Sequence, residues 1–239
     1  MSFILTLGSA ANTATLSTVD TLTSGVGADT IVFTGTVSNA SIDLGGGADT
    51  MTFAAGGNKA TASNVETLTG GTGADTITLG SVITTSMTVD LAAGSDALTL
   101  AKGGNTGSLA NIESVTGGTG ADVITLTTAL SNGSVDLAAG SDNLTFANGT
   151  NVASLGTIET VTGGTGTDTI TLSAATSNAT IDLGTGSDTL NLGNFAHTLS
   201  VSNVETITGN ALADTLTLGT ALTTGMTIDL AAGDRKSVV

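Results

Sequence analysis

Nine aspartates follow short glycine-rich stretches at regular intervals, and each directly precedes a segment that alternates apolar and polar residues. They are Asp29, Asp49, Asp75, Asp96, Asp122, Asp142, Asp168, Asp188 and Asp214. The clearest example is the run Gly70-Gly71-Thr72-Gly73-Ala74-Asp75-Thr76-Ile77-Thr78. A carboxylate beside exposed backbone carbonyls offers only hard oxygen ligands, a donor set that favours Ca²⁺ over zinc or copper. These aspartates are therefore candidate metal ligands.

The other acids keep to the same pattern. The twentieth acid is Asp234, near the end of the chain. The other ten precede the turns: Asp20, Asp43, Glu66, Asp90, Glu113, Asp136, Glu159, Asp182, Glu205 and Asp229. An Asp after Gly and before a strand is also ordinary turn chemistry, through Asx hydrogen bonds. For a single motif the structural interpretation is favoured. For nine motifs in register, we favour cation binding.

A repeat of 46 or 47 residues covers the chain. It is marked by Val19-Asp20, Val65-Glu66, Ile112-Glu113, Ile158-Glu159 and Val204-Glu205. Each repeat has two similar halves, each with a glycine turn and short Val, Ile, Leu and Thr strands, and no proline interrupts them. The pattern predicts an all-β parallel solenoid (β-roll or β-helix) of about ten coils, with one turn per coil of about 23 residues.

The repeat predicts a single domain over residues 1–233, with units starting near residues 19, 65, 112, 158 and 204. Residues 234–239, Asp-Arg-Lys-Ser-Val-Val, break the pattern and match the translation of a common sequencing adapter. We expect them to be an artefact, and the chain to be a fragment of a longer array. Phe3 stands where the repeat places an Asp.

Composition argues against several functions. The net charge is −16 with only four Lys and Arg, so no basic patch is available for nucleic acid. No apolar run approaches the ~18–20 residues of a membrane span. Cysteine is absent and the single histidine, His197, is expected in an exposed loop beside Phe195. No nucleophile and base are paired, so we expect no enzyme activity.

Three stretches carry a resemblance to a known family. Residues 70–78, 117–125 and 163–171 are similar to the G-G-x-G-x-D-x-U-x nonapeptide of the repeats-in-toxin (RTX) proteins. The resemblance implies a parallel β-roll with Ca²⁺ held between neighbouring turns, most strongly at Asp75, Asp122 and Asp168. The implied ligand residues are Gly70, Gly71, Gly73, Asp75, Asp96, Gly117, Gly118, Gly120, Asp122, Asp142, Gly163, Gly164, Gly166, Asp168, Asp188, Asp29 and Asp49.

This chain departs from the family pattern in two ways. Family nonapeptides run in direct tandem with two turns per short coil, whereas one turn per longer coil is expected here. Short turns such as Leu91–Asp96 keep only the last Gly and the Asp. They are expected to bind weakly, or to use Asp43, Asp90, Asp136 and Asp182 as extra ligands.

The pattern as a whole predicts a calcium-binding, calcium-stabilised extracellular segment of an S-layer, adhesin or RTX exoprotein. Export is expected by type I secretion, because Met1–Leu7 has no signal-peptide character. Residues 101–111, 147–157 and 193–203 are expected to be outer loops for self-association or cell-surface contacts. The alternatives are the non-catalytic RTX tail of a secreted hydrolase, a metal-independent solenoid spacer, and an ice-binding solenoid with outward Thr-x-Thr segments.

Overall fold

The computed structural model describes residues 2–221, 224–231 and 237–238, and all regular structure in them is β-strand. The chain forms two compact units, Met1–Gly118 and Thr119–Val239. The predicted all-β parallel solenoid is confirmed, because each unit consists of two sheets of parallel strands. Of the predicted off-repeat tail, residues 234–236 and 239 lie outside the described residues, and Ser237–Val238 form the last strand, β26.

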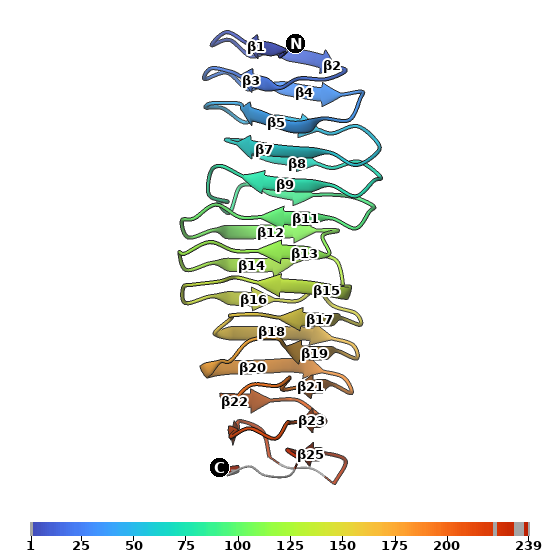
Figure 1. The fold of residues 1–239 in the computed structure, drawn as a ribbon, viewed down its shortest axis with the longest axis vertical. Helices are drawn as coiled ribbons and strands as arrows, with labels where there is room; N and C mark the ends of the chain where they lie inside the picture. Colours follow the sequence, from blue (N-terminus) through green and yellow to red (C-terminus); the bar gives the residue numbers. More distant parts are fainter. Residues whose placement is uncertain (1, 222–223, 232–236, 239) are drawn as a thin grey trace. The chain divides into compact units, whose positions relative to one another are not determined.

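In the first unit the chain alternates between two sheets, A and B, so that each coil contributes one strand to each sheet (Figure 1). Sheet A contains, in spatial order, β1 (Ile4–Thr6), β3 (Thr21–Thr23), β5 (Ser38–Asp43), β7 (Lys59–Ser63), β9 (Thr76–Leu79), β11 (Ala97–Thr99) and β13 (Ser114–Thr116). Sheet B contains β2 (Thr13–Leu16), β4 (Thr30–Phe33), β6 (Thr50–Thr52), β8 (Thr67–Thr69), β10 (Thr88–Asp90) and β12 (Thr106–Ala110).

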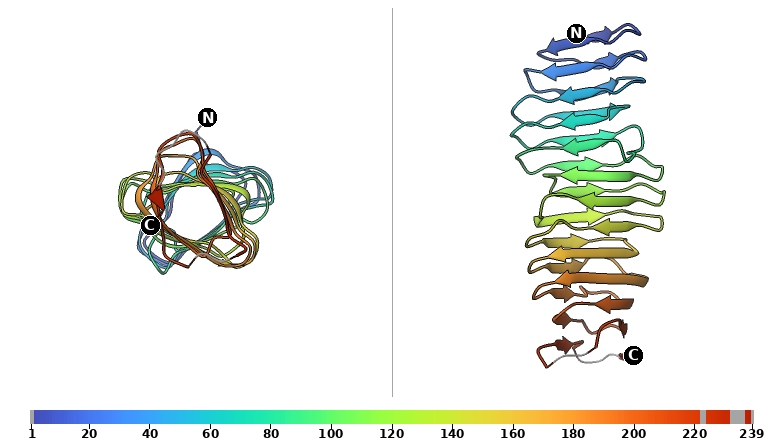
Figure 2. Two further views of the ribbon diagram at one scale, coloured as in Figure 1. Left: turned by 90° about the horizontal axis from the view of Figure 1, so that it is seen from below. Right: turned by 180° about the vertical axis from the view of Figure 1, so that it is seen from behind.

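The second unit repeats this arrangement, and Figure 2 shows the strands from behind. Its sheet B contains β14 (Val123–Leu126), β16 (Asn143–Thr145), β18 (Thr160–Thr165), β20 (Ser177–Thr185), β22 (Thr198–Ser202), β24 (Thr215–Leu218) and β26. Its sheet A contains β15 (Ser131–Asp136), β17 (Val152–Leu155), β19 (Thr169–Leu172), β21 (Thr189–Asn191), β23 (Thr206–Thr208) and β25 (Thr227–Asp229).

The coil is shorter than predicted. Register partners lie between 17 residues (Ala60 and Ile77) and 22 residues apart (Leu216 and Val238), not about 23. Each coil therefore has two turns, and the prediction of one turn per coil is wrong. The 46-residue repeat contains five strands, which is two and a half coils. Equivalent residues of successive repeats consequently fall on opposite sheets, as Leu22 does in sheet A and Leu68 in sheet B.

The missed fifth strand lies in the segments predicted to be outer loops. These segments contain β12, β17 and β22. Small residues such as Gly107, Ala153 and Ser200 replace the usual Thr, Leu and Ile there, which conceals the alternation. The interpretation of these segments as outer loops is therefore wrong.

The interior of each unit is filled by stacked aliphatic side chains. In the first unit the register places Ile31, Met51, Leu68, Val89 and Leu109 in one fully buried column. Phe33 and Phe53 stack in the same interior, with ring centroids 5.7 Å apart. Such columns fix the register, because a one-residue slip would turn every apolar side chain outward.

Candidate cation-binding site

All nine predicted aspartates lie at the inner corners of the coils, directly before a strand, and none is more than 1 % exposed. We call the residue at this corner of a coil the rung residue. In other coils the same corner holds an Asn, such as Asn58, or a Glu, such as Glu113. The regular spacing of the aspartates in the sequence thus reflects their shared position at the corners of the solenoid coils.

Rung residues of successive coils are hydrogen-bonded to one another. The backbone N–H of Asp75 donates to Oδ1 of Asp96 over 2.7 Å, and the N–H of Asp96 donates to Oε2 of Glu113 over 2.8 Å. In the second unit Asp122, Asp142 and Glu159 repeat both bonds. Each side chain therefore pairs a backbone N–H that lies just before a strand begins. The acids that accept these bonds have this structural role whether or not a metal is bound.

The rung residues follow a five-coil cycle of Asn, Asp, Asp, Glu and an uncharged residue. In sheet B of the first unit the order is Asn12, Asp29, Asp49, Glu66, Ile83 and Asn105. In sheet A of the second unit it is Leu130, Asn151, Asp168, Asp188 and Glu205. Like charges are thus confined to groups of three acids rather than continuing along a whole edge, which limits their repulsion.

The Asn rungs supply N–H donors to a group of oxygens. Nδ2 of Asn58 lies 3.0 Å from the carbonyl oxygen of Ala54, 2.8 Å from that of Gly56 and 2.8 Å from Oδ1 of Asp75. We call these three oxygens the amide cage. The cage joins two neighbouring turns through one neutral side chain.

Where an Asp pair occupies successive rungs, oxygens converge beside a glycine. A Cβ added at Gly94 would lie 2.6 Å from the carbonyl oxygen of Gly73, 2.6 Å from Oδ1 of Asp96 and 3.0 Å from its Oδ2. Gly140 is in the same position, 2.5 Å from both Gly120 O and Asp142 Oδ1. Neither glycine has a positive φ, so glycine is needed here for space and not for backbone conformation. We call this space the oxygen cradle.

The second Asp of each pair has a buried oxygen without a hydrogen bond. Within the described part of the chain, this holds for Oδ2 of Asp49, Asp96, Asp142 and Asp188, and also for Oδ2 of Asp168. A buried polar atom without a partner is costly, so each of these oxygens requires a proton, a water molecule or a cation. This is the observation that fits a metal best.

Burial raises the pKa of the same four second aspartates, Asp49, Asp96, Asp142 and Asp188. For Asp142 the rise is to about 6; the hydrogen bond from Asp122 N opposes it, and the charges of Asp122 and Glu159 add to it. At Asp29 burial acts in the same direction, but hydrogen bonds from Ser24 and Asn12 lower the pKa overall. The second carboxylate of each pair is therefore the one that most lacks a compensating positive charge.

The residues fit a calcium ion by donor type, since carboxylate and carbonyl oxygens are the ligands it prefers. Among the described residues, however, no three acidic or histidine side chains converge as a metal site. A cation at the oxygen cradle would be held by an Asp carboxylate together with turn carbonyls. Of the implied ligands, Asp75 has both oxygens engaged, by Asn58 and by the N–H of Gly71, so the free oxygen is on Asp96 of the short turn.

The motif glycines have a second role in stacking. A Cβ at Gly71 would lie 2.0 Å from Ala54 O, and one at Gly70 would lie 2.3 Å from Leu91 O. In the other two motifs Gly118 and Gly163 approach Ala101 O and Leu183 O to 2.5 and 2.2 Å. At these four positions, therefore, only glycine lets the turn approach the backbone of its neighbour so closely.

The outer acids of the short turns are already hydrogen-bonded. Oδ1 of Asp90 accepts from the N–H of Ala92 over 2.9 Å and from Nδ2 of Asn111 over 2.7 Å. Asp43 and Asp182 make the same two kinds of bond. These oxygens close Asx turns, and their use as extra metal ligands stays a prediction.

His197 is buried, 2 % exposed, so the expectation of an exposed histidine is wrong. It occupies an Asn rung. Its Nε2 lies 2.6 Å from Leu192 O, and its Nδ1 lies 2.9 Å from Oγ1 of Thr176. The ring thus takes the role of the Asn amide, and its contact with Phe195 is edge-on, with centroids 6.4 Å apart.

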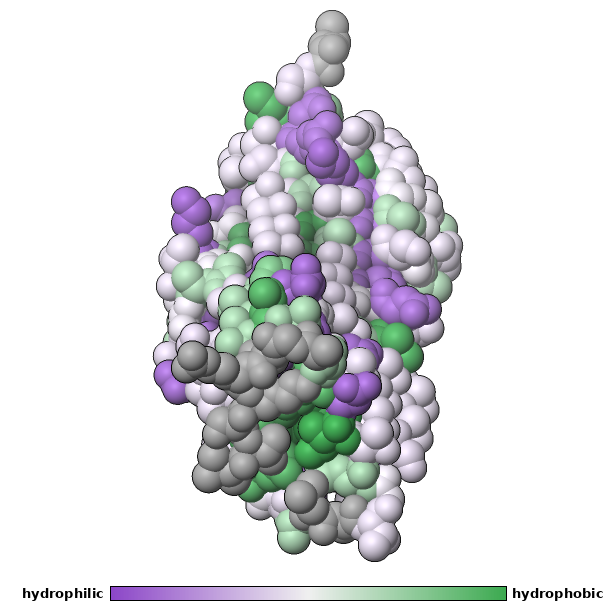
Figure 3. All heavy atoms as spheres, turned by 60° about the horizontal axis from the view of Figure 1, so that its bottom comes forward, coloured by the Kyte–Doolittle hydropathy of each residue, from purple (hydrophilic) through white to green (hydrophobic). Residues whose placement is uncertain are grey.

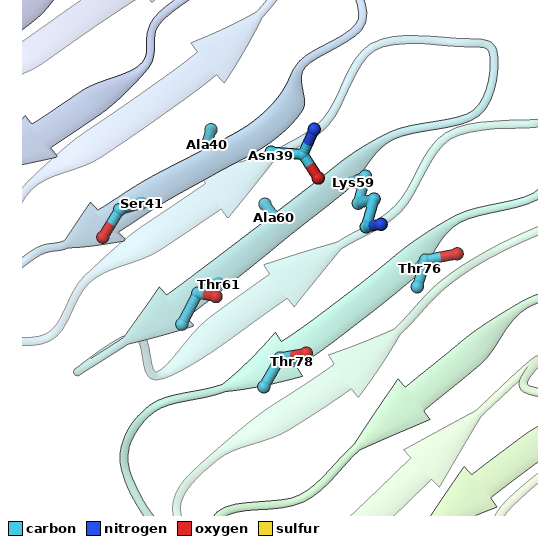
Figure 4. Close-up of a pocket in the computed structure, with 8 residues that line it drawn as sticks. All are labelled: Asn39, Ala40, Ser41, Lys59, Ala60, Thr61, Thr76 and Thr78. Carbon is cyan, nitrogen blue, oxygen red and sulfur yellow. The ribbon is translucent and has the colours of Figure 1, made fainter.

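Outward positions of the sheets carry hydroxyl groups in register. Figure 4 shows Ser41, Thr61 and Thr78 in one column across β5, β7 and β9, with Asn39 and Lys59 beside them around a shallow pocket. The face seen in Figure 3 is mostly of intermediate hydropathy, as Thr, Ser and Gly would give. The neighbouring column is interrupted by Asp43. The ice-binding alternative stays a prediction.

We expect Gly94→Ala to lower the stability of the chain, with or without metal, because the methyl group would lie among the oxygens of the cradle. Overpacking of this kind costs about 1–3 kcal/mol. Urea denaturation measures the change. Gly46→Ala is the matched control, since its Cβ would meet only Val26, at an ordinary 3.9 Å. Equal stability of the two variants would show that the cradle is not tightly closed.

Among the described residues, no helix has the length and apolar character to cross a bilayer. Comparisons with protein-family models, with curated proteins and with solved structures find no match to this chain. The fold and the ladder are therefore the observations from which function is argued.

Proposed function

We propose that this chain is a calcium-binding, calcium-stabilised structural or adhesive repeat segment that works outside the cell. A cation between the two turns of an Asp pair would neutralise carboxylates that folding buries. In a calcium-poor compartment the chain would be poorly ordered, and it would fold on reaching millimolar calcium. Surface-layer, adhesin and RTX exoprotein roles all need such a rigid spacer, as does the alternative of an RTX tail on a secreted hydrolase.

One observation carries the proposal. The second Asp of each pair has a buried oxygen, Oδ2, without a hydrogen bond, and the same carboxylate lies beside a glycine that also approaches a carbonyl of the preceding turn. The same arrangement of glycine, carbonyl and carboxylate occurs at Asp49, Asp96, Asp142 and Asp188. A fourfold recurrence supports a common ligand rather than a local defect.

A metal-independent solenoid spacer is the second candidate. It is favoured by the ladder, in which the second Asp of each pair already accepts a hydrogen bond from the backbone N–H of the first. In that case the free oxygen of each second Asp would be protonated or bound to water. The two candidates differ in whether calcium binds at all.

Isothermal titration calorimetry of the metal-free chain with CaCl₂ tests the proposal. We expect binding of several ions at ~0.1–1 mM affinity, the range of extracellular modules. Replacing both Asp96 and Asp142 by Ala should reduce the number of ions bound. MgCl₂ is the control and should bind more weakly, because Mg²⁺ demands near-ideal octahedral geometry and keeps its waters. No calcium binding at 10 mM would leave the metal-independent spacer.

A further inference from the structure

The Asn rungs indicate which of the spaces between two neighbouring turns can take a cation. We call each such space, at one rung, a turn space. We infer that the side-chain amides of Asn12, Asn58, Asn105 and Asn151 occupy the place of a cation, so that each repeat keeps one space closed and one open to metal. This inference rests on the proposed function, which it deepens by assigning the selection of sites to single side chains.

The amide cage is nearly identical in different repeats. Nδ2 of Asn151 lies 3.0 Å from Ala147 O, 3.1 Å from Gly149 O and 2.9 Å from Oδ1 of Asp168. These distances match those at Asn58, which contacts Ala54, Gly56 and Asp75. In both cages the amide joins two carbonyls of its own turn to the carboxylate of the next coil. One NH₂ group thus brings three oxygens together.

The next turn along the stack has the same spacing of residues but an Asp in place of the Asn. Counting back four and two residues from the rung gives Ala54 and Gly56 for Asn58, and Gly71 and Gly73 for Asp75. The carboxylate of the following coil is Asp75 in the first case and Asp96 in the second. The Asn amide that donates to Ala54 O is thus replaced by the Asp75 carboxylate, whose Oδ2 accepts from the N–H of Gly71 over 3.0 Å.

Replacing Asn by Asp at the rung changes the charge inside the turn space from partly positive to negative. In the Asn space a donor with partial positive charge lies among three oxygens. In the next turn two carboxylates, Asp75 and Asp96, follow each other on successive rungs, and Oδ2 of Asp96 has no hydrogen-bond partner among the described residues. A divalent cation restores the missing positive charge, whereas in the Asn space it would have to displace the amide from three hydrogen bonds of 2.8–3.0 Å.

The rule predicts one cation for each Asp pair. Within the described residues the pairs are Asp29 with Asp49, Asp75 with Asp96, Asp122 with Asp142, and Asp168 with Asp188. The spacing is one pair per 46-residue repeat. Because a repeat is two and a half coils, successive pairs precede strands of alternate sheets, as Asp49 precedes β6 of sheet B and Asp96 precedes β11 of sheet A. The cations would therefore link neighbouring turns before sheet B in one repeat and before sheet A in the next.

Rung exchange tests the rule in the full chain. The variants are Asn58→Asp, Asp75→Asn and the control Asn39→Asp, which changes an exposed Asn outside any cage. Calcium bound per chain is measured by equilibrium dialysis, and metal-free stability by urea denaturation. We expect Asn58→Asp to bind one more ion than the wild type and Asp75→Asn one fewer, with no change for Asn39→Asp.

Metal-free stability gives a second readout. Asn58→Asp should lower the urea midpoint and Asp75→Asn should raise it, because the amide supplies its own donor. If the wild type binds calcium but neither exchange alters the number of ions, the rule is overturned and the proposed function stands. If the wild type binds none, the proposed function fails. The amide rule then also fails unless Asp75→Asn is the more stable metal-free chain.

Discussion

Removal of calcium with EGTA at pH 7 should lower the β-sheet signal in circular dichroism and leave a weakly stable folded fraction, and addition of millimolar CaCl₂ should restore the full signal. At a calcium concentration 100-fold above Kd, each site adds about 2.7 kcal/mol to stability. The four Asp pairs together would add on the order of 10 kcal/mol, which is comparable with the whole ~5–15 kcal/mol stability of a typical domain. Without metal, the buried carboxylates at Asp49, Asp96, Asp142 and Asp188 remain uncompensated.

Two variants that each remove one negative charge distinguish calcium binding at the Asp pairs from a general effect of the acidic charge. Asp96→Ala removes the free buried oxygen and should make the chain less responsive to calcium. Asp43→Ala removes an exposed acid whose Oδ1 is already engaged in an Asx turn, and an unchanged calcium response of this variant would also exclude the predicted use of Asp43 as an extra ligand. A β spectrum that is the same in EGTA and in calcium would exclude coupled folding and leave a metal-independent solenoid.

The solenoid itself was predictable from sequence, because turn aspartates such as Asp75 and Asp122 recur with alternating strands after them. The coil length was not. Strands of the type Thr76–Leu79 are marked by Ile and Leu, whereas β12 and β17 contain Gly, Ala and Ser and depend on their neighbours in the stack for their structure. Because one strand per repeat was not recognised, the sequence predicted two long coils per repeat where the structure has two and a half short ones.

The candidate site was predictable in its residues but not in its division of roles. Sequence alone places Asp75 in the stronger motif and Asp96 in the weaker one, since only the former has three glycines. The structure reverses this order for the free oxygen, because Asn58 of the preceding coil already saturates one oxygen of Asp75. Asn58 lies 17 residues earlier, and its partner could not be assigned without the coil length.

The ladder also predicts how stability should change with pH, and in opposite directions with and without calcium. In the folded metal-free chain, burial raises the pKa of Asp142 from 3.8 to about 6, and it raises those of Asp49, Asp96 and Asp188. A raised pKa means that the folded state binds protons more strongly than the unfolded state. Its stabilising contribution is complete below pH ~4 and is lost as the pH rises through about 6.

The free energy of unfolding of the metal-free chain should therefore fall between pH 4.5 and pH 7, by about 2 kcal/mol from Asp142 alone. With saturating calcium the slope should reverse, because the ion requires the deprotonated carboxylates and protons compete for them. Urea denaturation across this pH range, in chelator-treated buffer and in 10 mM CaCl₂, measures both slopes. A pair of parallel curves would mean that metal and proton do not share these carboxylates. Opposite slopes that Asp142→Asn reduces, and Asp136→Asn does not, would place the competition at the buried rung rather than at the exposed acid six residues before it.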